Sequence, residues 1–247
     1  MRAFLKLTFV QVKLYLRDPM GVFFTLLFGP LMMVLLGMVF GNQPDPMFGG
    51  LGYMDISIPA YIGVIIAITG LTTIPITSAT RRESGVIRRF SATPLRPLTY
   101  FLSDIFSPFL MTLIGILLLF LTGKIMFQVQ FEGQFLQILI AICLGMLAFF
   151  TLGYVLANLL PSAQAAIVTG NIVLIPMMFL SGAYMPIQVM PQGVQDIAQF
   201  LPLTHLIALL RGLWFSPGLF AYSTQILVLG GILLIGSLIV VLTFRWE

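Results

Sequence analysis

Five of the twenty charged residues of this sequence lie in one short stretch, RRESGVIRRF at positions 81–90. The stretch holds four arginines and one glutamate, in a chain of which only 8% of the residues are charged. If it forms a helix, helical spacing divides it into an apolar face that begins with an acid and an opposite basic face. The first face consists of Glu83, Val86, Ile87 and Phe90, and the second of Arg81, Arg82, Arg88 and Arg89.

Two interpretations of this amphipathic helix differ in what its apolar face contacts. In one, the helix belongs to a loop on the positively charged side of a membrane, and its apolar face lies on lipid. In the other, the apolar face inserts into a groove of a cytoplasmic partner, while the arginines hold phospholipid headgroups or acidic residues of that partner. Gly85 would let the partner's backbone approach closely. The pairs Thr93-Pro94 and Arg96-Pro97 end the predicted helix, because a residue before proline avoids the α region.

The sequence contains no catalytic, nucleotide-binding or metal-binding motif. Gly123-Lys124 is followed by Ile125 and lacks the upstream glycine of a GxxxxGK[ST] phosphate loop. His205 is the only histidine and Cys143 the only cysteine, so a Cys/His metal cluster is excluded and a histidine triad would have to be built around His205. Carriers that relay charge place ionisable residues within a span, and no apolar stretch has one near its centre. Transport by this chain would therefore need energy from another chain.

The composition places the protein in a membrane. Hydrophobic residues make up 59% of the chain, and its mean hydropathy is +1.07, whereas a soluble domain carries about 25% charged residues. Six stretches contain the roughly 20 apolar residues that a transmembrane helix needs. They are residues 22–41, 59–80, 103–123, 134–160, 165–183 and 223–243. We therefore expect residues 1–247 to form one all-α polytopic membrane domain, without a soluble domain.

Residues 1–19 predict an amphipathic helix before the first span. Arg2, Lys6, Lys13 and Arg17 fall within an arc of about 60° on a helix. We expect this helix to lie on an anionic membrane surface, the alternative being an ordinary cytoplasmic flank of the first span. Because its basic residues are spread throughout, it is not a secretory signal peptide.

The basic residues also predict the orientation of the chain. With six spans and a cytoplasmic N-terminus, ten of the twelve lysines and arginines lie on the cytoplasmic side, as the positive-inside rule requires. The outer side then holds only Lys124 and Arg211. Both termini are therefore expected in the cytoplasm.

Residues 184–222 predict a re-entrant hairpin rather than a seventh span. Their apolar run, 197–215, is interrupted by a proline, a histidine and an arginine, and more prolines precede it. These residues are Pro186, Pro191, Pro202, His205 and Arg211. A charge exposed to lipid costs several kcal/mol, so two short helices that dip into the membrane and are shielded by protein fit better.

Polar side chains inside the predicted spans are a candidate substrate path. A threonine stripe occupies about 140° of the second span, and Asn171 lies in the fifth. The stripe consists of Thr69, Thr72, Thr73, Thr77 and Thr80. The alternative is that the hydroxyls bond their own i−4 carbonyls or pack helices together. Thr69, Thr72, Thr73 and Asn171 are the candidates for substrate contact.

The sequence resembles the membrane-spanning subunit of type-2 ABC exporters, close to the daunorubicin-export permease branch. Two stretches in the right order, on opposite sides of the membrane, carry the resemblance. The first, which is similar to the family's coupling helix, is Arg82-Glu83-x-Gly85 with Phe90-x-Ala92-Thr93-Pro94-Leu95. The second, which is similar to its outer hairpin, is Ser181-Gly182, Pro186, Met190-Pro191, Pro202-Leu203-Thr204 and Leu210-Arg211-Gly212.

The resemblance implies a homodimer, or a pseudo-dimer with a paralogue, docked on two separate ATPase subunits in the bacterial inner membrane. ATP and magnesium would bind those subunits, so this chain needs no cofactor, and its other partners would be membrane lipids rather than nucleic acid. The expected cargo is amphipathic or hydrophobic, such as a drug-like compound or a lipid. The alternatives are export of a lipid-linked glycan by the same architecture, a self-contained secondary carrier or channel, and a non-transporting assembly or sensor protein.

Overall fold

The computed structural model describes residues 2–44, 50–86, 97–184, 187–216 and 218–243. Six helical segments of this part of the chain are long and apolar enough to cross a membrane. They are α2–η1–α3 (Pro19–Phe40), α4–η3–α5 (Tyr53–Glu83), the part Leu102–Phe127 of α7 (Pro97–Phe127), α8 (Phe135–Leu159), α9 (Ala163–Leu180) and η5–α12 (Leu219–Thr243). The described ranges contain no strand apart from one isolated bridge. The prediction of an all-α membrane protein with six spans is therefore confirmed.

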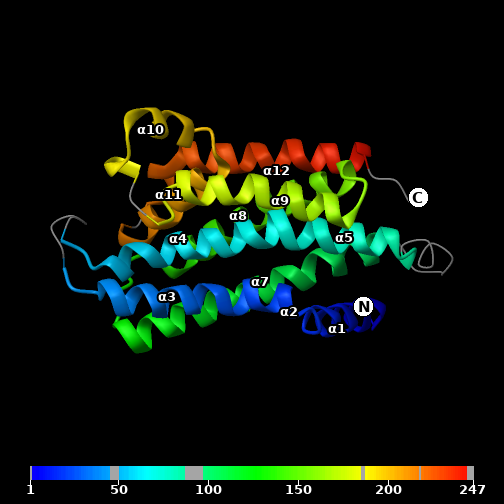
Figure 1. The fold of residues 1–247 in the computed structure, drawn as a ribbon, viewed down its shortest axis with the longest axis horizontal. Coiled ribbons are helices and arrows are strands. Elements are labelled where there is room, and N and C mark those ends of the chain that lie inside the picture. The colour runs from blue at the N-terminus through cyan, green and yellow to red at the C-terminus, as the bar shows by residue number, and fades with distance from the viewer. Residues whose placement is uncertain (1, 45–49, 87–96, 185–186, 217, 244–247) are drawn as a thin grey trace.

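The spans pack side by side as a bundle with two distinct ends (Figure 1). One end carries α1 (Arg2–Tyr15), the end of α5 and the last turn of α12, and we refer to it as the α1 end. The other carries α10 (Gln192–Ala198) and α11 (Pro202–Phe215), and we refer to it as the α11 end. Every long span connects these two ends.

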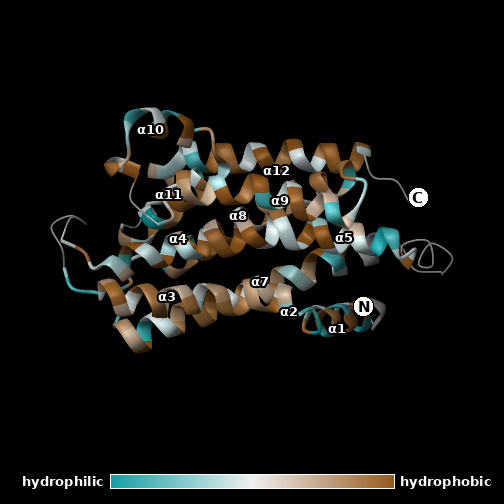
Figure 2. Ribbon diagram, in the orientation of Figure 1, coloured by the Kyte–Doolittle hydropathy of each residue, from teal (hydrophilic) through white to brown (hydrophobic). Residues whose placement is uncertain are grey.

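The second span is the core of the bundle. It consists of α4 (Tyr53–Ile68), the π-helical turn η3 (Thr69–Thr73) and α5 (Ile74–Glu83). In its apolar window 78% of the residues are buried, against 11% for the last span. Hydrophobic residues make up most of the long helices of the bundle (Figure 2), and many of the large ones are exposed. In water this surface would be unfavourable, whereas lipid tails solvate it, so burial inside the bundle distinguishes the central helix from the outer ones.

Two glycines bring neighbouring helices onto the backbone of η3. A Cβ atom at Gly170 of α9 would lie 2.5 Å from the Leu71 carbonyl oxygen, and one at Gly153 of α8 would collide with the carbonyl of Gly70. Pro75 has no N–H, so the ordinary i+4 hydrogen bond to the Leu71 carbonyl cannot form. A π-turn inside a helix is typical of functional segments, and here small residues on both sides make room for it.

The predicted amphipathic helix at the N-terminus is present as α1. Its buried face packs on α7, where Gln11 donates to the Ser103 hydroxyl (3.3 Å) and Ser107 donates to the Gln11 side-chain oxygen (3.2 Å). Lys6, Lys13 and Arg17 are exposed on the opposite side. The helix therefore presents its basic stripe outward while a polar seam fixes its other face to the bundle.

A capped turn joins α1 to the first span. Asp18 accepts a hydrogen bond from the backbone N–H of Met20 (3.2 Å), and Pro19 occupies the first position of α2 (Pro19–Val22). Both residues are typical of a helix start. The span continues through a π-helical turn, η1 (Phe23–Leu27), into α3 (Phe28–Phe40).

The predicted pair of short helices before the last span is also present. The axes of α10 and α11 are bent by 93° at their junction. α11 packs on α4, and its Trp214 donates to the backbone carbonyl of Gln130 (3.0 Å). The bend and the packing hold α11 against the bundle core rather than extending it as a straight seventh span.

Candidate coupling and transport site

The second span continues three residues past its predicted end at residue 80, and the helix predicted over residues 82–90 is interrupted. α5 stops at Glu83, and Gly85 adopts φ +67° in the left-handed region. The N–H groups of Ser84 and Gly85 still bond back to the carbonyls of Thr80 (3.0 Å) and Arg82 (3.1 Å), which is typical of a glycine-terminated helix. The prediction of one continuous helix over residues 82–90 is therefore wrong, and Glu83 does not share a helix face with Val86.

The remaining residues of the predicted docking face lie outside the described residues. They are Ile87, Arg88, Arg89, Phe90, Thr93 and Pro94. Their expected role in binding a partner therefore stays a prediction. The described part of the stretch, Arg81 to Val86, shows how that segment is joined to the bundle.

Arg81 connects the second span to the third and fourth. Its guanidinium forms an ion pair with Asp104 of α7, and the Tyr154 hydroxyl of α8 donates to the second oxygen of that carboxylate (2.9 Å). The Asp104 side chain is only 10% exposed and that of Arg81 26%. A half-buried pair with an added hydrogen bond holds its geometry better than an exposed pair.

Arg82 and Glu83 bind the tight connection between the fourth and fifth spans. Arg82 donates to the carbonyls of Ala157 (3.1 Å) and Leu160 at the C-terminal end of α8. Glu83 accepts from the backbone N–H of Ala163 (2.9 Å), the first residue of α9. A cation at a helix C-terminus and an anion at a helix N-terminus both complement the helix dipoles. The glutamate among the arginines is thus explained by the start of α9.

Sequence spacing did not reveal these contacts. Asp104 and Tyr154 lie far from the triplet in the chain, and only the fold brings them to it. One local signal did exist: Ser162 follows Pro161 and precedes an apolar run, and its hydroxyl accepts from the N–H of Ala165 (3.1 Å) as the N-cap of α9. That signal locates the start of α9, but not the side chain that approaches it.

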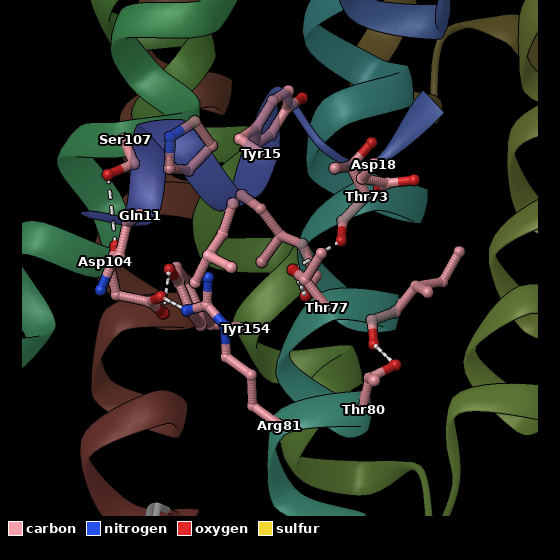
Figure 3. A pocket seen from close by; sticks show the side chains of 14 residues that line it. Gln11, Tyr15, Asp18, Thr73, Thr77, Thr80, Arg81, Asp104, Ser107 and Tyr154 are labelled. Carbon is pink, nitrogen blue, oxygen red and sulfur yellow. Dashed lines mark hydrogen bonds and ion pairs between the residues drawn. The ribbon is translucent and has the colours of Figure 1, made fainter. Parts of the chain in front are cut away.

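A cavity of about 370 Å³ opens beside this junction (Figure 3). It lies between α1, α5, α7 and α8, and Figure 3 shows the polar side chains that face it. These are Gln11, Tyr15, Asp18, Thr73, Thr77, Thr80, Arg81, Asp104, Ser107 and Tyr154. Burial raises the pKa of Tyr15 to about 12, and its hydroxyl lies 2.6 Å from that of Thr25. The cavity offers hydroxyl, amide and charged groups at one end of an otherwise apolar bundle.

The threonine stripe mostly bonds its own helix. Thr69, Thr72, Thr77 and Thr80 each donate to the carbonyl four residues earlier, at 2.6 to 3.0 Å. This is the alternative that the sequence left open. Hydroxyl oxygens keep lone pairs after donating, so they still offer acceptors to whatever enters the cavities.

The structure brings together three of the four candidate substrate residues. Thr72, Thr73 and Asn171 line a second cavity of about 320 Å³, which also contacts Asp18. Thr69 is fully buried elsewhere, and its hydroxyl lies within 3.3 Å of that of Thr112 on α7. Thr69 therefore joins helices in the interior and does not line either cavity.

The predicted residues of the hairpin lie at the α11 end. Gly182 adopts φ +78°, and its carbonyl accepts from the Arg211 guanidinium (3.2 Å). Pro191 is the N-cap of α10 and Pro202 is the first residue of α11. The remaining three are Ser181, which donates to the carbonyl of Met177, His205, whose Nε2 lies 2.8 Å from the carbonyl of Gln199, and Pro186, which is outside the described residues. Within the described ranges no group of three metal-ligating side chains occurs.

Comparison with known proteins relates the sequence to a family of membrane transporters. The model of the ABC-2 type transporter family matches residues 2–215. Nodulation protein J of Rhizobium leguminosarum bv. viciae is 48% identical over 65 residues, which cover 26% of this chain and 25% of that protein. The inner membrane transport permease YhhJ of Escherichia coli (strain K12) is 28% identical over 162 residues, which cover 63% of this chain and 43% of that protein.

The chain spans less than half the length of these relatives. The family match, in contrast, includes the N-terminal helix, the first five spans and the bent pair α10–α11. It thereby takes in the stretch around Arg82 and the hairpin around Arg211. Because it covers well over half of the sequence, the chain belongs to the ABC-2 type transporter family.

Proposed function

We propose that the chain is the permease subunit of an ATP-driven exporter whose energy comes from a separate cytoplasmic ATPase subunit. The observation that carries the proposal is the junction at the end of α5. Three consecutive side chains contact α7, α8 and α9, and they stand directly before the stretch with the apolar docking pattern. A movement of that stretch would be transmitted through Arg81, Arg82 and Glu83 from the second span to the third, fourth and fifth spans.

The central position of the second span supports this mechanism. The span is buried on most sides, so a displacement at its α5 end cannot occur without a response from its neighbours. ATP and magnesium belong on the partner subunit in this scheme. ATP-driven closure of two such subunits would displace the docking stretches and open a path between two permease chains toward the outside.

The two cavities support an amphipathic cargo. They lie on either side of Thr73 and Thr77, close to the α1 end. Their polar lining suits the head of an amphipathic molecule, and the apolar bundle surface suits its tail. A drug-like compound or a lipid fits this description.

A lipid-linked glycan is the second cargo class. The larger cavity favours it, because hydroxyl and amide groups such as those of Thr80, Ser107 and Gln11 suit a polyhydroxylated headgroup. The two cargo classes would share the same chain arrangement and the same energy source.

The proposed orientation places the α1 end in the cytoplasm of a bacterium, with the protein in the inner membrane. The exposed basic stripe of α1 supports it, since anionic lipids attract lysine and arginine at the membrane surface. The proposed assembly is a homodimer of permease chains on two ATPase subunits.

Reconstitution into liposomes tests the proposed function against its rivals. The chain is inserted alone or with its partner ATPase, and uptake of a labelled amphipathic compound into inverted vesicles is measured with ATP, with an ion gradient, or with neither. The proposal predicts uptake only with the partner and ATP. Uptake by the chain alone along a gradient would instead identify a secondary carrier, and partner binding without any uptake would identify an assembly or sensor protein.

A further inference from the structure

Arg211 is a half-buried cation that has no carboxylate partner among the residues that the structure describes. It lies on α11 and lines a cavity of about 380 Å³ at the α11 end. One of its terminal nitrogens donates to the carbonyl of Gly182 (3.2 Å), while Nε is buried and has no hydrogen-bond partner. In the described ranges the only ion pair joins Arg81 to Asp104, so no carboxylate there neutralises Arg211. A guanidinium in such a place is unfavourable unless an anion pairs with it.

Thr204 presents a second unsatisfied group to the same cavity. Its hydroxyl is buried and has no partner, and the residue lines the cavity with Arg211. The two positions are seven residues apart and share one face of α11. Long side chains on a helix extend toward its N-terminus, so the guanidinium reaches from Arg211 in the direction of Thr204.

The walls of the cavity around these two groups are formed mainly by apolar and aromatic side chains. Ile207, Ala208 and Phe215 supply apolar surface, and the aromatic ring of Tyr222 packs over Gly212. An apolar wall lowers the local dielectric, which strengthens a charge-assisted hydrogen bond inside the cavity. The site therefore combines a fixed cation, a hydroxyl and a desolvated surround.

We propose that this cavity binds a phosphate group through Arg211 and Thr204. The planar fork of a guanidinium matches two oxygens of a phosphate, and Nε belongs to that fork. The Thr204 hydroxyl would donate to a further oxygen. The proposal does not rest on the transport function, because it concerns the other end of the bundle.

Two sources can present this phosphate: a phospholipid headgroup and a free phosphate ion. The full chain is purified in detergent, freed of lipid, and titrated with inorganic phosphate at constant ionic strength or with phosphatidylglycerol in mixed micelles. The midpoint of thermal unfolding is followed, because a ligand that binds only the folded state raises it in a saturable way. Saturation by phosphatidylglycerol alone assigns the site to a lipid headgroup, and saturation by both probes assigns it to phosphate from either source.

Two variants of Arg211 and one control test its role in binding. Arg211→Gln removes the charge and is expected to weaken the apparent affinity by about tenfold or more, because charge-assisted hydrogen bonds to phosphate are lost. Arg211→Lys keeps the charge without the fork and should fall between that variant and the wild type. Lys124→Gln removes an exposed charge at the end of α7, at the same end of the bundle, and should change nothing.

The proposal is overturned if neither probe gives a saturable shift with the wild-type chain, or if Arg211→Gln binds as the wild type does. Thr204→Val keeps the test decisive should Arg211→Gln fail to fold. It removes only the hydroxyl, and a weakened affinity supports the site while an unchanged one contradicts it. In the lipid-free state we expect Arg211→Gln to be no less stable than the wild type, because the unpaired charge is gone.

Discussion

Three consecutive side chains, Arg81, Arg82 and Glu83, fix the end of the second span. The first pairs with a carboxylate on α7, the second caps the end of α8 and the third caps the start of α9. The end of α5 is held in place because three neighbouring residues on this one helix contact three different helices.

The ion pair of this triplet should be measurable by a double-mutant cycle. Asp104→Asn leaves the Arg81 guanidinium without its counter-charge and should lower the free energy of unfolding by about 2 kcal/mol. Arg81→Gln should act similarly, and the double variant should cost clearly less than the sum of the two. Unfolding in detergent gives these values, and strictly additive losses would show that the pair contributes nothing.

At the scale of the element, the second span ends in a left-handed turn at Gly85, just before the stretch that we propose as the docking site. Its left-handed φ of +67° disfavours a residue with a Cβ by roughly 1–2 kcal/mol, although no side chain crowds the position. Asparagine tolerates this conformation better than a β-branched residue does. The break thus depends on backbone geometry rather than on packing.

Substitution of Gly85 should therefore impair ATP-coupled uptake without impairing insertion of the chain into the membrane. Gly85→Val is expected to insert its six spans normally and to lose most ATP-coupled uptake, while Gly85→Asn retains most of it. Uptake by reconstituted complexes is compared with the amount of each variant in the membrane. Equal uptake by both variants would remove the role assigned to the break.

The close contact of α8 with η3 predicts that a larger residue at Gly153 destabilises the protein. Gly153→Ala places a Cβ against the Gly70 carbonyl and should cost about 1–3 kcal/mol of stability, as overpacking does. Gly231→Ala is the matched control, because nothing lies within 4 Å of its Cβ position and alanine favours the helix. Thermal unfolding of the two variants should diverge, and a Gly153→Ala protein as stable as the control would contradict the contact.

The elements could be predicted from the sequence, but their contacts could not. Apolar length alone located six spans, and the prolines before Arg211 located the bent pair α10–α11. The predicted helix over residues 82–90 is broken because Gly85 adopts a left-handed conformation, which the apolar spacing of Val86 and Phe90 does not reveal. The partners of Glu83 and Arg211 come from other helices, and spacing along one segment carries no information about them.

At the scale of the whole molecule, charge is distributed unevenly between the ends. The α1 end carries the exposed stripe of Lys6, Lys13 and Arg17 together with the arginines of the triplet. The α11 end carries the unpaired Arg211. This asymmetry is the basis of the proposed orientation, because basic residues remain on the cytoplasmic side of a bacterial membrane.

Cysteine labelling in intact cells tests this orientation. Cys143 is the only cysteine, so a Cys143→Ala chain accepts single new cysteines. A membrane-impermeant maleimide should label Lys124→Cys in intact cells, and Lys13→Cys only after the membrane is permeabilised. Both lysines are exposed in the structure, so the reverse pattern would invert the proposed orientation.

The central claim is that an ATPase subunit docks on the stretch that follows the triplet, and its most direct test is partner affinity. Phe90→Ala removes the largest apolar side chain of the predicted docking face, while Phe220→Ala removes an exposed ring, 92% accessible, near the α11 end. Truncating an aromatic anchor costs about 2 kcal/mol or more, which is roughly 30-fold in affinity. The account predicts that Phe90→Ala loses its partner ATPase during purification and that Phe220→Ala keeps it with coupled hydrolysis intact. Equal retention and equal hydrolysis in the two variants would contradict the account.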